Sequence, residues 1–488
     1  MTTDVALVDT TLRDGQQSLW AYRMPTSAML PTLADLDAAG FEAIEFVTPG
    51  PQFARMVRDL KEDPWAWVRA GVEHGTRTPL RLHGSVASRL SPIPVSVQHL
   101  MLETLAQMGI RTTRASDPWN DFEALDSTVA MMAQHGIRTV VNLVYSVSPR
   151  HTVEYFAQRA AQAAARRPYR ICLKDVGGLM TVEAAQEVIP AVVAAVGDVP
   201  LEFHAHCTNG LAPYLTLVAV EHGIRVVHTG VPPLADGDAQ PSVFTVVRNL
   251  RARGYTVDVD LEPLERVSAH LERVRRVEGL PAGQPRAFDA SVYDHQVPGG
   301  MISNLRFQLA GLGMGDRLEQ TLEEAARVRA DLGYPIMVTP LAQFVGSQAA
   351  INVVTGERYK HITDEIIQYT LGEWGREAPE VMDQDLRARI LARPRAQEMA
   401  RTPRAEPDLE SVRTGYGAGM TDEELLTRVF AGVGSGDLEL SRRRPARTYA
   451  EYAARHGSLA AMLRAMETSS TVRHVRYRGG GTTVDLHR

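Results

Sequence analysis

The sequence predicts an α/β fold in which eight strand–helix units form a TIM (β/α)8 barrel, followed by a mainly helical C-terminal domain. Short apolar runs recur about every 30 residues, which is the length of one strand–helix unit. Segments with apolar residues at helical spacing lie between these runs. Many of these segments end at a glycine directly before the next run, where a left-handed C-cap favours glycine.

The apolar runs are the expected barrel strands. A doubly wound sheet is the alternative architecture, but no Gly-x-Gly-x-x-Gly motif follows the first run, so the barrel is favoured. In chain order, the expected strands are residues 5–8, 43–47, 80–83, 110–113, 139–144, 170–173, 201–204 and 225–228.

The segments between the strands read as helices, for example residues 24–39 and 181–196. Beyond the barrel, helical spacing continues without intervening strands. The expected C-terminal helices are residues 261–279, 318–332, 343–355 and 363–375. The glycines expected to end barrel helices are Gly40, Gly109, Gly136 and Gly223.

These patterns divide the chain into three parts. We expect a catalytic barrel domain over residues 1–300 and a helical domain over 301–445 that completes the active-site funnel. A tail follows over 446–488, with a helix-like stretch and a glycine run. Residues 394–407 are rich in Arg, Pro and Ala and read as an irregular linker.

The composition is that of an ordinary globular protein, with 44% hydrophobic and 23% charged residues. The net charge of -6 gives no reason to expect a nucleic-acid partner. The two cysteines are too few for a disulfide framework. We see no signal peptide and no apolar run of about 18–20 residues, so we expect a cytoplasmic protein without a membrane span.

Four polar residues follow the ends of three expected strands, where the chemistry of such barrels takes place. Asp14 comes after the first strand, Lys174 after the sixth, and His204 and His206 at the end of the seventh. Residues i and i+2 of a strand point the same way, so the two imidazoles can meet one point. With the Asp14 carboxylate they form a donor set that suits zinc, with manganese or cobalt as alternatives.

Each residue alone has a simpler interpretation. A His-x-His pair is more often incidental than a metal site, Asp14 could cap the next helix, and Lys174 could pair with Asp175. Their joint occurrence at the mouth of one barrel favours the metal site.

Lys174 is one of only three lysines among 52 Lys and Arg residues. A buried lysine near cations can lose its proton, and the neutral amine can add carbon dioxide to form an anionic carbamate. Arginine cannot readily form this adduct, so the chemistry would explain why a lysine stands here.

Several long motifs resemble one family, the biotin-dependent carboxyltransferases. This family includes the carboxyltransferase domain of pyruvate carboxylase, the oxaloacetate decarboxylase alpha subunit and the transcarboxylase 5S subunit. The resemblance covers about residues 5–440, on the scale of a whole barrel domain with its helical extension. Its motifs are DTTLRDGQQSLWAYRMPT, CLKDVGGLMT, HAHCTNG, HQVPGGMISNL and YPIMVTPLAQFVGSQAAINVVTGERYKHITDEI.

The resemblance implies a metal-dependent carboxyltransferase or decarboxylase that acts on a small keto acid through a metal-stabilised enolate. It implies homodimers, and biotin that brings or accepts the carboxyl group. By resemblance, the metal ligands are Asp14, His204, His206 and a carbamylated Lys174. Arg13 and Gln17 would bind substrate, and Ser303 stands where the family has a threonine that shuttles a proton. Arg13 and Lys174 are therefore also expected among the catalytic residues.

Three places depart from the family pattern. Residues 47–53 replace a Gly-Gly-Ala-Thr-Phe-Asp run. His83 stands where the family has an arginine for the substrate carboxylate, and an imidazole cannot form the same bidentate clamp. Cys207 replaces an aspartate, either as a soft ligand or as a small residue that fills space. Asp117, Asn120 and Asp121 match the family's fourth-strand segment in part.

Biotin carriers in the family attach biotin to a lysine, usually within Ala-Met-Lys-Met. The lysines here are Lys61, Lys174 and Lys360, and none lies in such a setting. We therefore expect carboxybiotin on a separate carrier protein. The alternatives are a biotin-independent lyase or aldolase-like enzyme with a rebuilt substrate pocket, and a non-catalytic assembly subunit.

Overall fold

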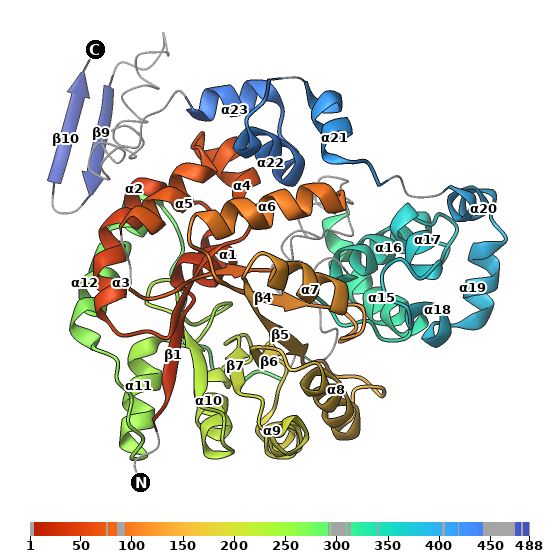
Figure 1. Ribbon diagram of the computed structural model, residues 1–488, viewed down its shortest axis with the longest axis horizontal. Coiled ribbons are helices and arrows are strands. Elements are labelled where there is room, and N and C mark those ends of the chain that lie inside the picture. Colours follow the sequence, from red (N-terminus) through yellow and green to blue (C-terminus); the bar gives the residue numbers. More distant parts are fainter. Residues whose placement is uncertain are drawn as a thin grey trace.

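The computed structural model of the chain describes residues 4–487 apart from 75–76, 85–92, 291–292, 294–308, 310–313, 339–340, 403–405, 418, 443–473 and 480–481. Its first part is a closed barrel of eight parallel strands, with β1 paired to both β2 and β8 (Figure 1). The predicted barrel is confirmed. The strands are β1 (Ala6–Asp9), β2 (Ala43–Val47), β3 (Leu80–His83), β4 (Thr112–Ser116), β5 (Arg138–Val144), β6 (Arg170–Asp175), β7 (Leu201–Ala205) and β8 (Val226–Thr229).

Helices surround the barrel and cover the outer faces of its strands (Figure 1). The predicted 181–196 helix is α9, whereas the predicted 24–39 helix is divided, because Pro31 lacks a backbone N–H and lies in a 3-10 turn. The helices are α1 (Gln16–Trp20), α2 (Thr26–Met29), η2 (Leu30–Thr32), α3 (Leu33–Ala38), α4 (Pro51–Arg55), η3 (Met56–Leu60), α5 (Pro64–Glu73), α6 (Val95–Gln107), α7 (Asp126–Gln134), α8 (Val153–Ala165), α9 (Val182–Val196), α10 (Ala212–Glu221), α11 (Val243–Ala252) and α12 (Leu261–Glu278).

The glycines expected to end barrel helices have the required backbone conformation. Gly40, Gly109, Gly136 and Gly223 all have positive φ angles. A side chain strains the backbone there, so glycine allows each helix to stop and the chain to turn into the next strand.

A second hydrophobic core lies beside the barrel and is built mainly from helices after residue 317. The four predicted C-terminal helices are present. The expectation of an irregular linker over residues 394–407 was wrong for its first half, because Pro394 begins a helix at a position that needs no N–H and Ala396 is buried in this core. The helices are η4 (Gly315–Arg317), α15 (Leu318–Asp331), α16 (Leu341–Thr355), α17 (Asp364–Thr370), α18 (Ala378–Val381), α19 (Gln384–Leu391) and α20 (Pro394–Arg401).

The barrel loop after β4 joins the two cores. Trp119 in this loop is almost fully buried among the residues of the second core. Two residues further on, Asp121 accepts hydrogen bonds from Arg376 Nε at 2.8 Å and Nη2 at 2.7 Å. Glu377 pairs with both Arg150 and Arg159 of the barrel. These contacts fix the helical part against the β4 and β5 side of the barrel.

The chain then returns to the barrel in α21 (Leu409–Tyr416), α22 (Asp422–Ala431) and α23 (Ser435–Arg442), which cross α4 to α6 in Figure 1. Leu425 and Leu426 of α22 are buried in the barrel's own hydrophobic core. Trp65 of α5 donates from Nε1 to the Glu423 carbonyl at 2.9 Å. The division at residues 300 and 445 stays a prediction.

Near the C-terminus, β9 (His474–Gly479) and β10 (Thr482–His487) form an antiparallel hairpin. Sequence patterning did not predict it, although the first glycine of the run, Gly479, is the last residue of β9. The helix-like stretch over 449–466 lies outside the described residues. Within the part of the chain that the structure describes, no helix is long and apolar enough to cross a membrane.

Candidate active site

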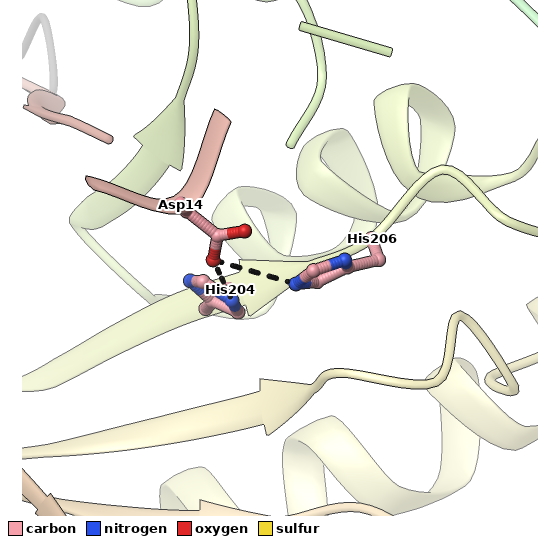
Figure 2. Close-up of side chains that lie close together, drawn as sticks. All are labelled: Asp14, His204 and His206. Carbon is pink, nitrogen blue, oxygen red and sulfur yellow. Dashed lines mark ion pairs between the residues drawn. The ribbon is translucent and has the colours of Figure 1, made fainter. Parts of the chain in front are cut away.

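Three ligand-type side chains converge at the C-terminal mouth of the barrel (Figure 2). Asp14 Oδ2 lies 3.3 Å from His204 Nε2 and 3.4 Å from His206 Nε2. All three residues are buried, with exposed fractions of 2%, 0% and 8%. Their ligand atoms lie within 4.8 Å of one another, which matches a shared metal ion. The predicted convergence from two separate strands is therefore present.

A π-helical turn, η1 (Thr11–Gly15), carries Asp14 into this position. The Asp9 carboxylate at the end of β1 accepts a hydrogen bond from Thr11 Oγ1 at 2.5 Å, which holds the start of the turn. A Cβ on Gly15 would lie 2.4 Å from the Leu234 backbone oxygen, so only glycine permits the close approach to the loop after β8. Such wide turns are rare and occur frequently at functional sites.

The hydrogen bonds of His206 leave one ring nitrogen open. Its Nδ1 lies 2.6 Å from the Asp238 carbonyl oxygen, which can only accept, so Nδ1 carries the hydrogen. In the neutral ring Nε2 then bears a lone pair, and this buried atom has no hydrogen-bond partner among the described residues. This lone pair faces the Asp14 carboxylate, and two acceptors this close call for a cation between them. The residues thus fit a divalent metal.

Asp14 is ionised for a physical reason. Burial alone would raise its pKa, but the adjacent Arg13 guanidinium holds the pKa of Asp14 well below its usual range. Its Oδ2 accepts from Arg13 Nη2 and its Oδ1 from Ser18 Oγ, both at 2.9 Å. The site therefore offers a carboxylate at neutral pH.

Lys174 is the penultimate residue of β6, next to β7, where its backbone pairs in register with His204. It is 8% exposed. Burial lowers the pKa of Lys174 to about 7, and the nearby Arg114 and Arg13 add to this effect. The next residue, Asp175, accepts hydrogen bonds from the backbone N–H groups of Leu179 and Met180, each at 2.8 Å. Asp175 is thus engaged in shaping the turn after β6.

Arg13 and Gln17, the two substrate-binding residues implied by the resemblance, lie side by side. Arg13 Nη1 donates to Gln17 Oε1 at 3.3 Å, and Tyr22 Oη donates to the same oxygen at 2.7 Å. Gln17 is exposed, whereas Arg13 is buried. The pair therefore links the buried centre to the accessible surface of the barrel mouth.

Two family models match the chain: one described as HMGL-like over residues 4–271, and one described as a conserved carboxylase domain over residues 292–435. A pyruvate carboxylase subunit from Methanocaldococcus jannaschii is 36% identical over 390 residues, which are 79% of this chain and 68% of that protein. The chain belongs to the biotin-dependent carboxyltransferase family. It is therefore an enzyme of a class that makes or breaks carbon–carbon bonds.

Other carboxyltransferase relatives are named for different substrates. The 2-oxoglutarate carboxylase large subunit of Hydrogenobacter thermophilus is 30% identical over 450 residues, covering 90% of this chain and 69% of that one. The methylmalonyl-CoA carboxyltransferase 5S subunit of Propionibacterium freudenreichii subsp. shermanii is 29% identical over 435 residues, covering 87% and 85%. The carboxyl transferase domain of Rhizobium etli pyruvate carboxylase has the same fold, with a TM-score of 0.79 at 24% identity over 92% of this chain and 79% of that one.

His83, at the place of the family arginine, is a neutral group in this carboxyltransferase. Burial, together with Arg13 and Arg114, holds the pKa of His83 well below its usual range. Its Nδ1 lies 3.3 Å from Arg114 Nη2 and 3.9 Å from Glu45 Oε2. An ion pair from His83 to a substrate carboxylate is thus disfavoured, and its role in substrate binding stays a prediction.

Sequence reasoning missed the buried ion pairs beside the candidate metal ligands. Glu45 pairs with Arg13 and also with Arg114, whose Nε lies 2.9 Å from Glu45 Oε1. Although burial opposes ionisation, the two guanidinium groups, Arg114 foremost, hold the pKa of Glu45 well below its usual range. A charged residue inside an apolar strand run needs a buried partner, and that signal could have identified Glu45.

The remaining predicted positions have separate outcomes. Cys207 is buried and its Sγ lies 3.9 Å from Asp236 Oδ1, which supports the space-filling interpretation. Asp117 accepts from the backbone N–H groups of Trp119 and Asp121, at 2.8 and 3.0 Å, and so shapes the loop after β4. Ser303 lies outside the described residues, and its role stays a prediction.

Proposed function

We propose that this chain is the carboxyltransferase subunit of a biotin-dependent enzyme. It moves a carboxyl group between biotin on a separate carrier protein and a small keto acid. The single observation that carries the proposal is the acceptor-rich centre of Asp14, His204 and His206 in a member of this family. His206 Nε2 is buried there and has no hydrogen-bond partner within the described part of the chain.

The centre would hold one divalent metal, for which we propose zinc because two imidazoles and a carboxylate form a preferred zinc ligand set. When bound, the metal supplies Lewis-acid stabilisation for negative charge that develops on a substrate carbonyl oxygen. Asp14 would provide an anionic ligand and His206 an imidazole nitrogen, Nε2.

Lys174 would complete the ligand set as a carbamate. Its lowered pKa, about 7, keeps a large fraction of the amine neutral near neutral pH. The nitrogen lone pair forms a bond to the carbon of CO2, one C=O π bond opens onto oxygen, and the nitrogen releases a proton to solvent. The product carries a negative charge that the neighbouring Arg13 and Arg114 favour.

Arg13 and Gln17 would orient the substrate at the mouth. The buried Arg13 guanidinium already divides its donors between Asp14 and Glu45, while Nη1 reaches only the exposed Gln17 amide at 3.3 Å. A substrate carbonyl or carboxylate can replace that long contact. Ser303 would move the proton between biotin and substrate, as the resembling threonine does in the family.

The carrier would be a separate protein. Lys61 is paired with Asp437 at 3.4 Å, Lys360 with Glu357 at 3.2 Å, and Lys174 is buried in the site. None of the three has the setting of a biotinylated lysine. We also propose that the protein is a homodimer, which light scattering on a sizing column would test.

The proposed substrate is a small keto acid, because relatives are named for pyruvate and 2-oxoglutarate as well as for methylmalonyl-CoA. The neutral His83 offers no ion pair to the substrate carboxylate that the family arginine would hold, so Arg13 is the cation left to bind this group.

The test is carboxyl exchange with free biotin in place of the carrier. The purified chain, incubated with biotin and oxaloacetate, should release pyruvate and CO2 faster than without biotin, and avidin should suppress the stimulation. Turnover that is unaffected by biotin and avidin would contradict the proposal and point to the biotin-independent enzyme. Parallel assays with 2-oxoglutarate and its carboxylated product test whether a dicarboxylic acceptor is used.

A further inference from the structure

A chain of buried side chains runs from the barrel interior to the metal ligands. Arg81 holds the Glu202 carboxylate with two hydrogen bonds, at 2.8 and 3.0 Å. His228 Nε2 lies 3.0 Å from Glu202 Oε2, and His228 Nδ1 lies 3.0 Å from His204 Nδ1. All four residues are at most 1% exposed. Because these side chains are buried, a hydrogen bond to water cannot replace a contact between them.

The Glu202 carboxylate determines which atom donates in each of these hydrogen bonds. Glu202 is anionic beside Arg81 and can only accept, so the hydrogen of His228 lies on Nε2. A neutral imidazole then has a lone pair on Nδ1, which must accept from His204 Nδ1. His204 therefore keeps its hydrogen on Nδ1 and presents a lone pair on Nε2, the atom that faces Asp14.

The contact of Gln240 with the other ring nitrogen of His204 independently indicates the same tautomer. Gln240 Oε1 accepts from the Ala205 backbone N–H at 3.2 Å, so the Gln240 side chain turns its NH2 group toward His204. Gln240 Nε2 lies 3.0 Å from His204 Nε2 and can only donate. A lone pair is again required on Nε2. The amide and a metal ion would compete for this one lone pair.

A second metal ion in the interior is the alternative use of these residues, since Cys172, Glu202 and His228 have ligand atoms within 4.8 Å of one another. Their neighbours argue against it. Both Glu202 oxygens already accept from Arg81, and Arg114 Nη1 lies 3.5 Å from Cys172 Sγ. Burial raises the pKa of Cys172 to about 11, so the thiol is protonated. A dication would meet two guanidinium groups there.

We propose that His228 and Glu202 are positioning residues that hold His204 in the tautomer with its lone pair on Nε2, ready for a metal ion. The inference rests on the metal centre of the proposed function and deepens it. A carboxylate or carbonyl behind a histidine ligand fixes the ring and its tautomer in the same manner in many metal sites. Here an additional imidazole lies between the carboxylate and the ligand.

The first test is the histidine tautomer in the metal-free wild-type protein. Correlation of ring hydrogens with 15N-labelled histidine nitrogens should show the hydrogen of His204 on Nδ1 and that of His228 on Nε2. The His204→Gln and His228→Asn variants assign the two signals by their loss. A His204 ring with its hydrogen on Nε2 would overturn the proposal.

The second test is the affinity for zinc, measured by competition with a chromophoric chelator. His228→Phe removes the acceptor but keeps a ring, and should weaken zinc binding by about 10- to 100-fold. His228→Asn keeps an acceptor near the position of Nδ1 and should restore most of the affinity. His270→Phe is the matched control, because His270 is a buried histidine of α12 that contacts the Ala28 carbonyl; its zinc affinity should equal that of wild type.

Unchanged zinc affinity in a folded His228→Phe protein would overturn the proposal, and so would two zinc ions per chain that fall to one in that variant. Circular dichroism and thermal unfolding establish folding, and the wild-type tautomer remains decisive if the variant does not fold. Neither test uses catalysis. A protein with the stated tautomer and affinities but no carboxyl transfer would refute the proposed function alone.

Discussion

Two buried polar clusters lie in the same barrel and differ in how their acceptors are satisfied. In the interior cluster, Glu202 receives two hydrogen bonds from Arg81, one from Arg170 and one from His228, so every charge has an opposite partner. At the mouth, Asp14 faces the ring nitrogens of His204 and His206 at 3.3 and 3.4 Å, and His206 Nε2 has no hydrogen-bond partner among the residues that the structure describes.

This difference separates a scaffold from a ligand site. A buried cluster whose acceptors are satisfied and whose charges are paired needs no cation and serves to hold the strands in place. A cluster with surplus acceptors bears an energetic cost that a cation would remove. We therefore assign the proposed metal to the mouth and regard the interior as its support.

The largest expected effect on stability comes from breaking the interior cluster. Arg81→Met keeps the approximate volume but leaves Glu202 as a buried charge with weaker compensation, which should cost about 3–5 kcal/mol of unfolding free energy. Urea unfolding of the metal-free protein measures this loss. Arg55→Met, which breaks a half-exposed pair with Asp59, is the control and should be unchanged. Equal stability of Arg81→Met and wild type would show that the interior cluster is no scaffold.

A substitution in the cluster at the barrel mouth should change bound metal and turnover. Asp14→Asn removes the anionic ligand with little change in size, so bound metal should be lost and turnover should fall about a thousandfold, because Lewis-acid stabilisation is worth several kcal/mol. Metal analysis and the exchange assay give the two readouts. Asp35→Asn, which alters only an exposed pair with Arg266, controls for the loss of a carboxylate. Full activity of the Asp14→Asn enzyme would show that Asp14 is not part of the site.

Lys174 tests whether the mouth cluster has a fourth member. The amine is neutral above its pKa of about 7, so a carbamate signal from 13C-labelled bicarbonate should grow as the pH rises from 6 to 8. Lys174→Arg should abolish the signal and lower turnover by about a hundredfold, since a cation replaces an anionic ligand. Lys61→Arg should keep both. A labelled carbamate that persists in Lys174→Arg would place it on another amine.

The smallest effect concerns a buried histidine outside both clusters. Burial, with Arg329, Arg150 and Arg159 nearby, lowers the pKa of His151 to about 3. The unfolded chain therefore takes up this proton first, at about pH 6.5, and stability falls as the pH drops from there toward 3 by about 1.4 kcal/mol per pH unit. His151→Asn should reduce the loss between pH 7 and 5 in urea unfolding. The same loss in both proteins would show that His151 is already charged.

The barrel was predictable because its signals are local. Each strand is a short apolar run, and glycines such as Gly40 and Gly223 mark the turns into the next strand. The helix from Pro394 was missed because its sequence is polar, and its helicity depends on burying Ala396 against a distant core. The hairpin of β9 and β10 was missed for a similar reason, since its strands have few apolar residues.

The candidate site was predictable only in part. Asp14, His204 and His206 could be placed together because the ends of parallel barrel strands meet at one face. The partners behind them could not, because which of Glu45, Arg114, Glu202 and His228 touch depends on how side chains cross the barrel interior. The open lone pair of His206 also required the structure, since it depends on the position of the Asp238 carbonyl.

The most direct measurement of the central claim is metal content set against carboxyl exchange in one preparation. The native chain should contain one divalent ion, lose biotin-stimulated exchange when a chelator removes that ion, and recover it when zinc is returned. Full exchange in a chain shown to be free of metal would contradict the assignment of Asp14, His204 and His206 as a catalytic metal centre.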